Sequence, residues 1–472
     1  MHPKKLMVLA GALAACLTLP TAHAQETLSH GRFTDVTLYR PHGAVSSFVL
    51  FLSGDGGWNQ GVVGMAEALA DEGALVAGIS VPQLVANLEQ DGASCVMPDG
   101  DLENLSHYVQ SYAKLPTYYT PLLVGYSSGA SLAYAMLAQA PTNTFSGAIS
   151  LGFCPELSIR KSLCRGDGLG STPRQDGGVN LLPARALGNP WVALQGEQDA
   201  VCSAAVTRQF VADTGNATLV SLPNVGHGYS VTRNWLPQFL STFHQLQAEQ
   251  PPMTPPAGLA DLPLVEVPAA GGSDLFAVLL SGDGGWAGLD KAVGSALAAR
   301  GVSVVGVDSL RYFWTPRTPE GLATDLDRVL RFYAAHWGKS RAVVIGYSQG
   351  ADVLPFALNR LPSTSRNLVA RSVLIAPGEQ ASFEFHLANW VLDDAGDRAT
   401  LPEAMRLDAA RTLCLYGRDE DDSLCEKVPA GHVTAEALPG GHHFDGAYET
   451  LANRVLTGLE IPTARLADGR GR

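Results

Sequence analysis

The chain has 472 residues, which is more than one ordinary domain needs, so we expect two domains of about 200 residues each. Hydrophobic residues make up 46% and charged residues only 16%, a composition that excludes a long disordered chain. The net charge of -13 argues against a basic nucleic-acid-binding surface, and no nucleic-acid partner is expected.

The N-terminal segment has the three parts of an export signal. Two lysines precede an apolar stretch, and Ala22-His23-Ala24 offers a cleavage site between small residues. The apolar stretch is shorter than the ~20 residues of a membrane-spanning helix, and no later segment is long and apolar enough either. We therefore expect a signal peptide over residues 1–24. The alternative is lipid anchoring at Cys16, because Leu13-Ala14-Ala15-Cys16 resembles a bacterial lipoprotein box.

Two motifs occur twice, and this repeat determines the expected domain organisation. Ser53-Gly54-Asp55-Gly56-Gly57-Trp58 recurs unchanged at residues 281–286, and Gly125-Tyr126-Ser127-Ser128-Gly129 recurs as Gly346-Tyr347-Ser348-Gln349-Gly350. Between the two halves lies a proline-rich stretch that predicts an extended linker over residues 247–260. We expect one domain over residues 25–246 and a second over residues 261–472.

Within each half, short apolar runs alternate with amphipathic stretches of helical length. This alternation predicts an α/β fold in which a mostly parallel sheet is flanked by helices. The expected strands, in chain order, are residues 48–52, 75–79, 122–124, 147–151 and 191–195, then 276–280, 302–307, 342–345, 372–376 and 413–416. The expected helices include residues 61–70 and 290–299.

Each Gly-x-Ser-x-Gly motif follows a predicted strand and precedes a predicted helix, the context of a nucleophile elbow. Ser127 and Ser348 are therefore the candidate nucleophiles. A serine hydroxyl needs a histidine to take its proton and an acid to hold that histidine in one tautomer. In the first half, Asp199 and His227 follow the serine in the expected order.

The acid and base of the second half are predicted from the first. Aligning residues 198–202 on residues 421–425 selects Asp422 over the neighbouring acids Asp419, Glu420 and Asp421. His227 lies four residues after Pro223, which ends the preceding strand, and the residue four after Pro439 is His443, so we favour His443 as the base. His442 stays an alternative, because it keeps the Gly-His pair of the first half. With Asp422 and His443, the spacing from serine to acid and the spacing from serine to histidine are each nearly the same in the two halves.

Acyl transfer also needs donors for the developing oxyanion, usually two backbone N–H groups. The glycine-rich turn and the residue after the nucleophile can supply them. We expect the N–H groups of Asp55 and Ser128 in the first half, and of Asp283 and Gln349 in the second. The sequence has no phosphate-loop, dinucleotide-binding or Cys/His metal spacing, so neither a cofactor nor a metal is expected.

Six cysteines follow Cys16, and an even number in an exported chain predicts disulfides. Cys414 and Cys425 bracket the loop of Asp422, and we expect them to pair. Four cysteines allow three pairings in the first half. The expected one joins the two nearest in sequence, which gives Cys154–Cys164 and Cys95–Cys202.

Together these features make each half resemble an α/β-hydrolase domain. In the second half, Ser281–Trp286, Val307–Trp314, Gly346–Asp352 and Pro439–Phe444 together resemble the VirJ/AcvB family of exported bacterial virulence proteins. The resemblance implies a periplasmic location and, for AcvB-like members with two parts, hydrolysis of aminoacyl-phosphatidylglycerol. Carried over, the nucleophile is Ser348. The first half departs from the family pattern because it also has a complete set of serine, acid and histidine. Whether one site or two is active stays open.

An aminoacylated phospholipid at the membrane surface presents an ammonium group, which nearby acids can select. Asp308 and Asp352 are the candidate acids, and Trp314 is a candidate apolar contact for the lipid. Ser131 stands where the second half has Asp352, so we expect the second half to carry most of the activity. The alternatives are a general carboxylesterase or lipase, and a non-catalytic binding or secretion-accessory protein.

Overall fold

The computed structural model describes residues 25–248 and 258–459, except residues 93, 143, 167, 176, 272, 386–397 and 421–422. The expected signal peptide and the middle of the expected linker lie outside this range. Helix α6 (Leu236–Ala248) continues two residues past the predicted end of the first domain. Within the described part of the chain, none of the helices has the length and apolar character needed to cross a membrane.

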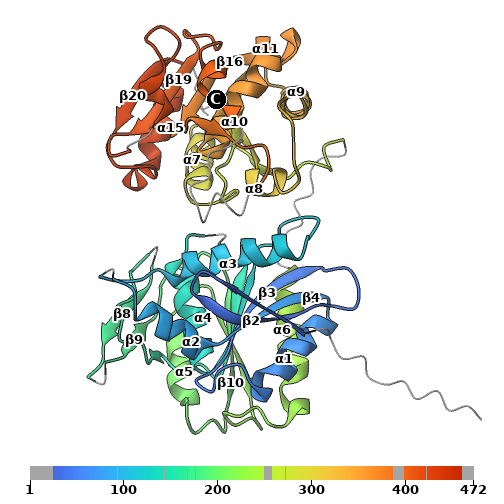
Figure 1. Ribbon diagram of the computed structural model, residues 1–472, viewed down its shortest axis with the longest axis vertical. Helices are drawn as coiled ribbons and strands as arrows, with labels where there is room; N and C mark the ends of the chain where they lie inside the picture. The colour runs from blue at the N-terminus through green and yellow to red at the C-terminus, as the bar shows by residue number, and fades with distance from the viewer. Residues whose placement is uncertain are drawn as a thin grey trace, which may run out of the picture.

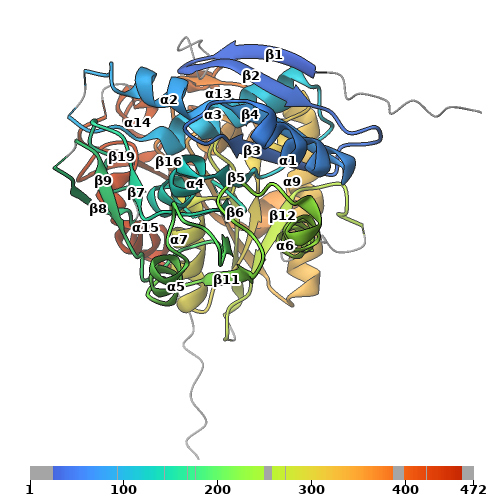
Figure 2. The same ribbon diagram turned by 90° about the horizontal axis from the view of Figure 1, so that it is seen from below.

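Each half of the chain builds its own sheet with helices on both faces (Figure 1). In the first sheet, β1 and β2 are antiparallel to their neighbours at one edge, and the other six strands are parallel. Figure 2 shows this antiparallel pair at the rim of the molecule. The spatial order is β1 (Gln25–His30), β2 (Phe33–Tyr39), β4 (Ala74–Ile79), β3 (Ser47–Leu52), β5 (Leu122–Tyr126), β6 (Gly147–Leu151), β10 (Trp191–Gly196) and β11 (Ala217–Leu222).

The second sheet repeats the first from its second strand onward. Its first strand is antiparallel to its neighbour, as β2 is, and the remaining strands are parallel. The spatial order is β12 (Leu264–Val267), β14 (Ser303–Val307), β13 (Leu275–Leu280), β15 (Arg341–Tyr347), β16 (Val369–Ile375), β19 (Thr412–Gly417) and β20 (Thr434–Leu438).

All ten predicted strands are present, with ends that differ by at most three residues. In the two main sheets, the strands that were missed lie at the edges or, in the case of β2, next to an edge strand. In β11, for example, only Leu222 is buried, so the strand has no continuous apolar run to identify it. The fully buried parallel strands in the middle of each sheet gave the strong signal, because both of their faces are covered.

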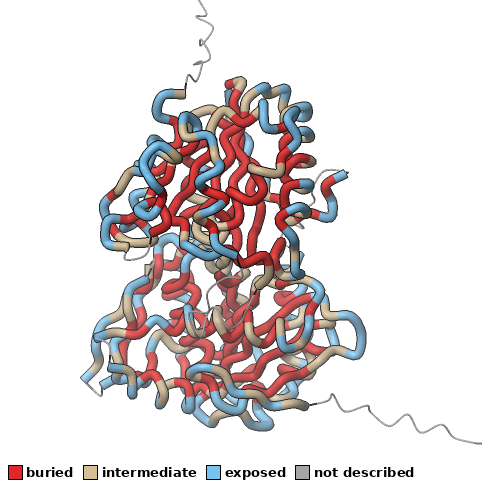
Figure 3. Tube along the Cα trace, turned by 45° about the horizontal axis from the view of Figure 1, so that its top comes forward, coloured by how far each residue is buried: buried red, intermediate tan, exposed pale blue. Residues whose placement is uncertain are grey.

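Helices pack on both faces of each sheet. Successive residues of β3 enter opposite core clusters: Phe48, Leu50 and Leu52 pack on one face, and Val49 and Phe51 on the other. Figure 3 shows these buried strands in red inside each half. The helices are α1 (Gln60–Asp71), α2 (Val81–Leu88), α3 (Pro98–Tyr112), α4 (Ser128–Gln139), α5 (Ala204–Ala212), α7 (Gly288–Ala299), α8 (Ser309–Tyr312), α9 (Pro319–His336), α10 (Gln349–Arg360), α11 (Ser363–Leu368), α13 (Leu401–Ala404), α14 (Leu424–Lys427) and α15 (Tyr448–Leu456).

Short elements complete the two halves. They are the 3-10 helices Thr232–Asn234 and Phe444–Gly446, the small sheet of β7 (Glu156–Leu157), β9 (Val179–Leu182) and β8 (Gly170–Pro173), and the pair β17 (Gln380–Ala381) and β18 (Arg398–Ala399). Both small sheets follow the fourth parallel strand of their half, after β6 and after β16.

The described residues form three disulfides, and one of the expected pairings is confirmed, Cys414–Cys425. The first-half prediction was wrong, because the bridges are Cys95–Cys164 and Cys154–Cys202. The prediction from proximity in sequence failed because the order of strands in the sheet determines which cysteines come together. Cys154 and Cys202 follow β6 and β10, which are neighbouring parallel strands.

The two halves meet where α3 and the loop after it face α8, as Figure 1 shows. The guanidinium of Arg311 donates to the Tyr118 carbonyl at 3.3 Å and to the Thr120 hydroxyl at 3.2 Å. The indole N–H of Trp314 donates to the Leu115 carbonyl at 2.7 Å. Trp314, predicted to contact lipid, thus has a hydrogen-bond partner across the junction of the two halves.

His107 on α3 is buried at this junction, and its ring packs on Tyr118 and on Phe385 of the second half. Burial lowers the pKa of His107 from 6.5 to about 3. Below pH 6.5 the unfolded chain binds a proton here that the native state does not. Stability is therefore lost as the pH falls from 6.5 toward 3, by about 1.4 kcal/mol per pH unit from this group.

We expect His107→Phe to flatten the dependence of Tm on pH over that acidic range, because the substitution removes this proton linkage. Thermal unfolding at a series of pH values measures the slope. His336→Phe, at an exposed position on α9, is the matched control. Equal slopes for His107→Phe and wild type would contradict the prediction.

Candidate active sites

Both candidate nucleophiles lie in a strained turn between a strand and a helix. Ser127 has φ 55° between β5 and α4, and Ser348 has φ 51° between β15 and α10. Non-glycine residues rarely adopt this left-handed conformation, which aims the side chain away from the chain on either side. Both serines therefore form nucleophile elbows, as the motifs predicted.

The glycines of the elbow are required by close backbone contacts. A Cβ on Gly125 would lie 2.0 Å from the Gly129 carbonyl oxygen, and one on Gly350 would lie 2.3 Å from the Leu280 carbonyl oxygen. Neither distance leaves room for a side chain. The helix after the serine can pack this closely against the strands only because these positions are glycine.

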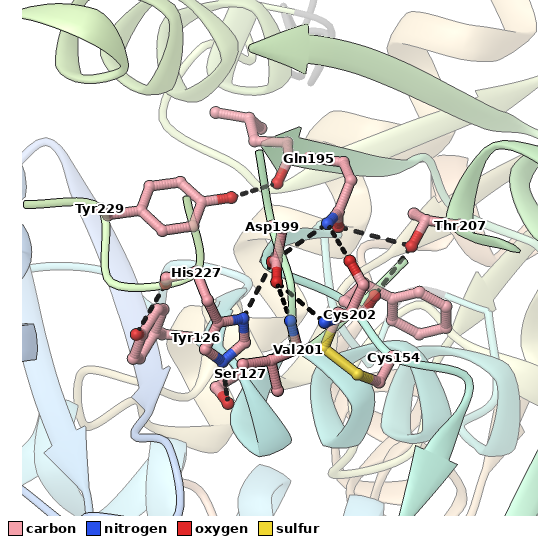
Figure 4. Close-up of polar contacts among 12 residues, drawn as sticks. Tyr126, Ser127, Cys154, Gln195, Asp199, Val201, Cys202, Thr207, His227 and Tyr229 are labelled. Atoms are coloured by element: carbon pink, nitrogen blue, oxygen red, sulfur yellow. Dashed lines mark hydrogen bonds and ion pairs between the residues drawn. A yellow bond between two sulfur atoms is a disulfide. The ribbon is translucent and has the colours of Figure 1, made fainter. Parts of the chain in front are cut away.

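In the first half, Ser127, His227 and Asp199 form a continuous hydrogen-bonded chain (Figure 4). Ser127 Oγ lies 2.9 Å from His227 Nε2, and His227 Nδ1 lies 2.9 Å from Asp199 Oδ2. The other oxygen of the buried Asp199 carboxylate accepts the backbone N–H groups of Val201 and Cys202. The acid thus holds the proton of His227 on Nδ1 and leaves Nε2 able to accept the serine proton.

The second half contains the same arrangement with a glutamate as the acid. Ser348 Oγ lies 3.0 Å from His442 Nε2, and His442 Nδ1 lies 2.5 Å from Glu420 Oε1. The second oxygen of Glu420 accepts the Gly417 N–H at 3.1 Å. His443 is directed elsewhere, with its Nδ1 2.9 Å from the Tyr347 hydroxyl.

The preference for His443 was therefore wrong, and His442 is the counterpart of His227. The hydroxyls of Tyr126 and Tyr347, which precede the two nucleophiles, donate to the carbonyls of His227 and His442. Counting from the proline failed because the second loop is one residue shorter. The Gly-His pair, kept in both halves, was the reliable signal.

The predicted acid Asp422 lies outside the described residues, and Glu420 occupies the position of the acid. The cysteines used for the alignment are not equivalent, because Cys202 pairs with Cys154 and Cys425 with Cys414. The glycines that end β10 and β19 are equivalent: the N–H groups of Asp199 and Glu420 both donate to their carbonyls at 3.2 Å. Counting from these glycines finds both acids, and the spacing from serine to acid becomes identical in the two halves.

The glycine-rich turns lie against the nucleophiles, as the oxyanion prediction requires. A Cβ on Gly54 would lie 3.2 Å from Ser127 Cβ, and one on Gly282 would lie 3.4 Å from Ser348 Cβ. Ser128 and Gln349 are the first residues of α4 and α10, so their N–H groups have no acceptor within the helix. This placement supports the N–H groups of Asp55, Ser128, Asp283 and Gln349 as the donors.

The two acids predicted to bind substrate have structural partners instead. Asp352 accepts the Gly378 N–H at 2.6 Å, and Asp308 caps α8 by accepting the Arg311 N–H at 3.1 Å. Burial raises the pKa of both carboxyls. Neither residue lines the cavity into which Ser348 opens, so the geometry does not support direct contact between these acids and the substrate.

The two elbows lie beside different cavities. Ser348 opens into a cavity of about 1120 Å³ that also contacts Met97, Glu103 and Thr142 of the first half. The cavity beside the first elbow has about 520 Å³ and is lined by first-half residues alone. The second histidine is also more accessible, with 41% of the His442 side chain exposed against 18% for His227. The larger and more open site thus lies between the two halves.

Within the described ranges, one group of side chains has the proximity of metal ligands, Asp199, Cys202 and His227. The sulfur of Cys202 is bonded to Cys154, and the other two residues contact each other in the triad. This group therefore lacks a free third ligand.

A comparison with known protein families finds a match in the second half of the chain. Residues 274–462 match the family described as bacterial virulence protein (VirJ). A search of curated proteins found no match.

Three solved structures that are similar to this protein each align with about half of the chain. A putative dienelactone hydrolase from Klebsiella pneumoniae is 16% identical with a TM-score of 0.33, covering 48% of this chain and 98% of its own. A serine hydrolase from Xanthomonas campestris is 20% identical with a TM-score of 0.32, covering 50% and 98%. Esterase 2 from Thermogutta terrifontis is 14% identical with a TM-score of 0.34, covering 50% and 97%. The α/β-hydrolase fold of each half is seen directly in its strand order and elbow.

We expect Glu420→Gln to lower the reactivity of Ser348 by about 10³-fold to 10⁴-fold, because an amide can present its N–H₂ group to His442 and favour the wrong tautomer. The rate of labelling by a fluorophosphonate, measured in a Ser127→Ala background, reports on Ser348 alone. Asp419→Asn, in the same loop, is the matched control. Normal labelling of Glu420→Gln would show that Glu420 is not the acid.

His442→Ala should lose labelling in the same assay, since the serine then has no base. His443→Ala removes a neighbouring imidazole that does not contact Ser348, and we expect it to keep most of the labelling. The opposite ranking of these two variants would restore His443 as the base.

Proposed function

With residues 274–462 assigned to the VirJ family and a hydrogen-bonded Ser348, His442 and Glu420 within them, we propose that this protein is a periplasmic serine hydrolase. Its proposed substrate is the aminoacyl ester of aminoacyl-phosphatidylglycerol. The single observation that carries the hydrolase proposal is the chain of contacts from Ser348 to Glu420. The family resemblance supports the substrate, and three disulfides support an oxidising compartment.

In the proposed reaction, His442 Nε2 takes the proton of Ser348 Oγ as the serine attacks the ester carbonyl carbon. The N–H groups of Gln349 and Asp283 stabilise the negative oxygen of the tetrahedral intermediate. Collapse breaks the ester bond, and the alcohol of phosphatidylglycerol leaves with the proton from His442. Water, activated by His442, then hydrolyses the acyl-enzyme and releases the amino acid.

Throughout this cycle Glu420 keeps the Nδ1 proton in place and stabilises the imidazolium that forms twice. The contact at 2.5 Å and the N–H bond from Gly417 position the carboxylate for this role. No step requires a cofactor.

The complete triad of the first half favours a second candidate activity, general carboxylester hydrolysis at Ser127. Its acid is fully buried, and its histidine contacts both the serine and the aspartate. Its adjoining cavity is less than half as large as that of Ser348, which supports smaller acyl esters there. Two assembled triads argue against the alternative of a non-catalytic binding protein, because binding alone requires neither.

We expect purified protein to release the amino acid from alanyl- and lysyl-phosphatidylglycerol in mixed micelles. Ser348→Ala should reduce this release by at least about 10³-fold, and Ser127→Ala should leave most of it. Circular dichroism and Tm confirm that each variant is folded. No release by wild-type protein would refute the substrate, and loss of release in Ser127→Ala alone would reverse the roles of the two halves.

A further inference from the structure

The same hexapeptide has different surroundings in the two halves. Asp55 is exposed beside the first elbow, whereas its counterpart Asp283 is partly covered and lines the Ser348 cavity between the halves. Burial raises the pKa of the Asp283 carboxyl. The identical turn thus presents its carboxyl to solvent in one half and to a partly closed catalytic cavity in the other.

Asp290 is the more unusual acid in this cavity. It is 3% exposed, and its Oδ1 atom has no hydrogen-bond partner, while the carboxyl also accepts the Gly282 N–H. The equivalent residue of α1 is Val62, which is buried as an apolar side chain. The fold therefore does not require an acid here, and burying an unpaired carboxyl oxygen destabilises the protein. Asp290 also lines the cavity of Ser348, so a cationic ligand group beside it would offset the cost of this unpaired carboxyl oxygen.

A third acid comes from the other half of the chain. Glu103 on α3 lines the same cavity, where burial and the charges of Asp99 and Asp283 raise its pKa to about 8. Among the ion pairs of the described residues, none involves Glu103, Asp283 or Asp290. Lys291 is the one lysine or arginine among the described residues that line the cavity, so acids are in excess there. When ionised, Asp283 repels both Glu103 and Asp290, and a cation between these carboxyls would offset that repulsion.

We propose that Asp290, Asp283 and Glu103 form an acidic pocket that binds the cationic group of the acyl portion of the substrate. The proposal rests on the hydrolase function of Ser348 and extends it, because Glu103 makes the first half part of the second half's substrate site. An α-ammonium is attached to the carbon next to the ester carbonyl. A cavity shared by the nucleophile and the acids can therefore hold both groups of one aminoacyl ester.

The comparison between the halves defines what each should recognise. The first half has Val62 in place of Asp290, and its Asp55 is exposed, so its own site lacks this pocket. The pocket also replaces Asp308 and Asp352 as the carboxyls that select the ammonium, since neither of those lines the cavity.

The test compares two esters of glycerol in a Ser127→Ala background, so that turnover reports on Ser348. Alanyl glycerol and isobutyryl glycerol have nearly the same shape, but only the first carries an ammonium. We expect kcat/KM to favour the alanyl ester by about 10-fold or more, the range of a charged hydrogen bond. Asp290→Asn and Glu103→Gln should each remove most of this preference and leave kcat/KM for the isobutyryl ester within about threefold.

Glu67→Gln removes one carboxylate from α1 of the same half and is the matched control for Glu103→Gln. Equal loss on both esters would mean that the acids only support the fold, and an unchanged preference would mean that they do not contact the ammonium. Either result overturns the acidic pocket. Turnover that persists after Ser348→Ala in this background would instead overturn the hydrolase function itself, so the two failures are distinguishable.

Discussion

The close contact between each elbow and the neighbouring strands is the constraint on which both sites depend. The helix after the serine packs so tightly that two glycine positions have no space for a Cβ. This packing holds the serine in a left-handed conformation and directs its hydroxyl to the carboxyl end of the sheet, where the acid and histidine loops also end. A looser contact would let the serine relax, and the geometry of the triad would be lost.

The two halves use this scaffold with different degrees of closure. In the first half the carboxylate is an aspartate, fully buried and fixed by two N–H groups of its own turn. In the second half the longer glutamate reaches a more exposed histidine at 2.5 Å. The loop from the strand-ending proline to the histidine is one residue shorter in the second half, and there the same strand-end turn carries the longer side chain of glutamate.

The contact between the halves gives the duplication a physical role. Arg311 and Trp314 of the second half donate to backbone and hydroxyl groups that follow α3, and the Trp314 ring also packs on Tyr118. These bonds hold α3, with Glu103, over the turn of Asp283. Arg311 and Trp314, which follow β14 and have no counterpart in the first half, thus form the junction between the halves. This junction encloses the larger cavity.

The sequence alone determined the duplication, the ten central strands, both nucleophiles and the complete first-half triad. Each depends on local patterns: a buried parallel strand is a continuous apolar run, and an elbow needs glycines at fixed positions. Sequence also contained the repeated serine-to-acid spacing that identifies Glu420, although the alignment on cysteines concealed it. Only the tertiary structure decided which cysteines pair, that His442 rather than His443 meets Ser348, and that Glu103 enters the cavity of the other half. These outcomes depend on which strand ends and helices come together in the folded chain. Such contacts join residues that are far apart in sequence, so local patterns do not reveal them.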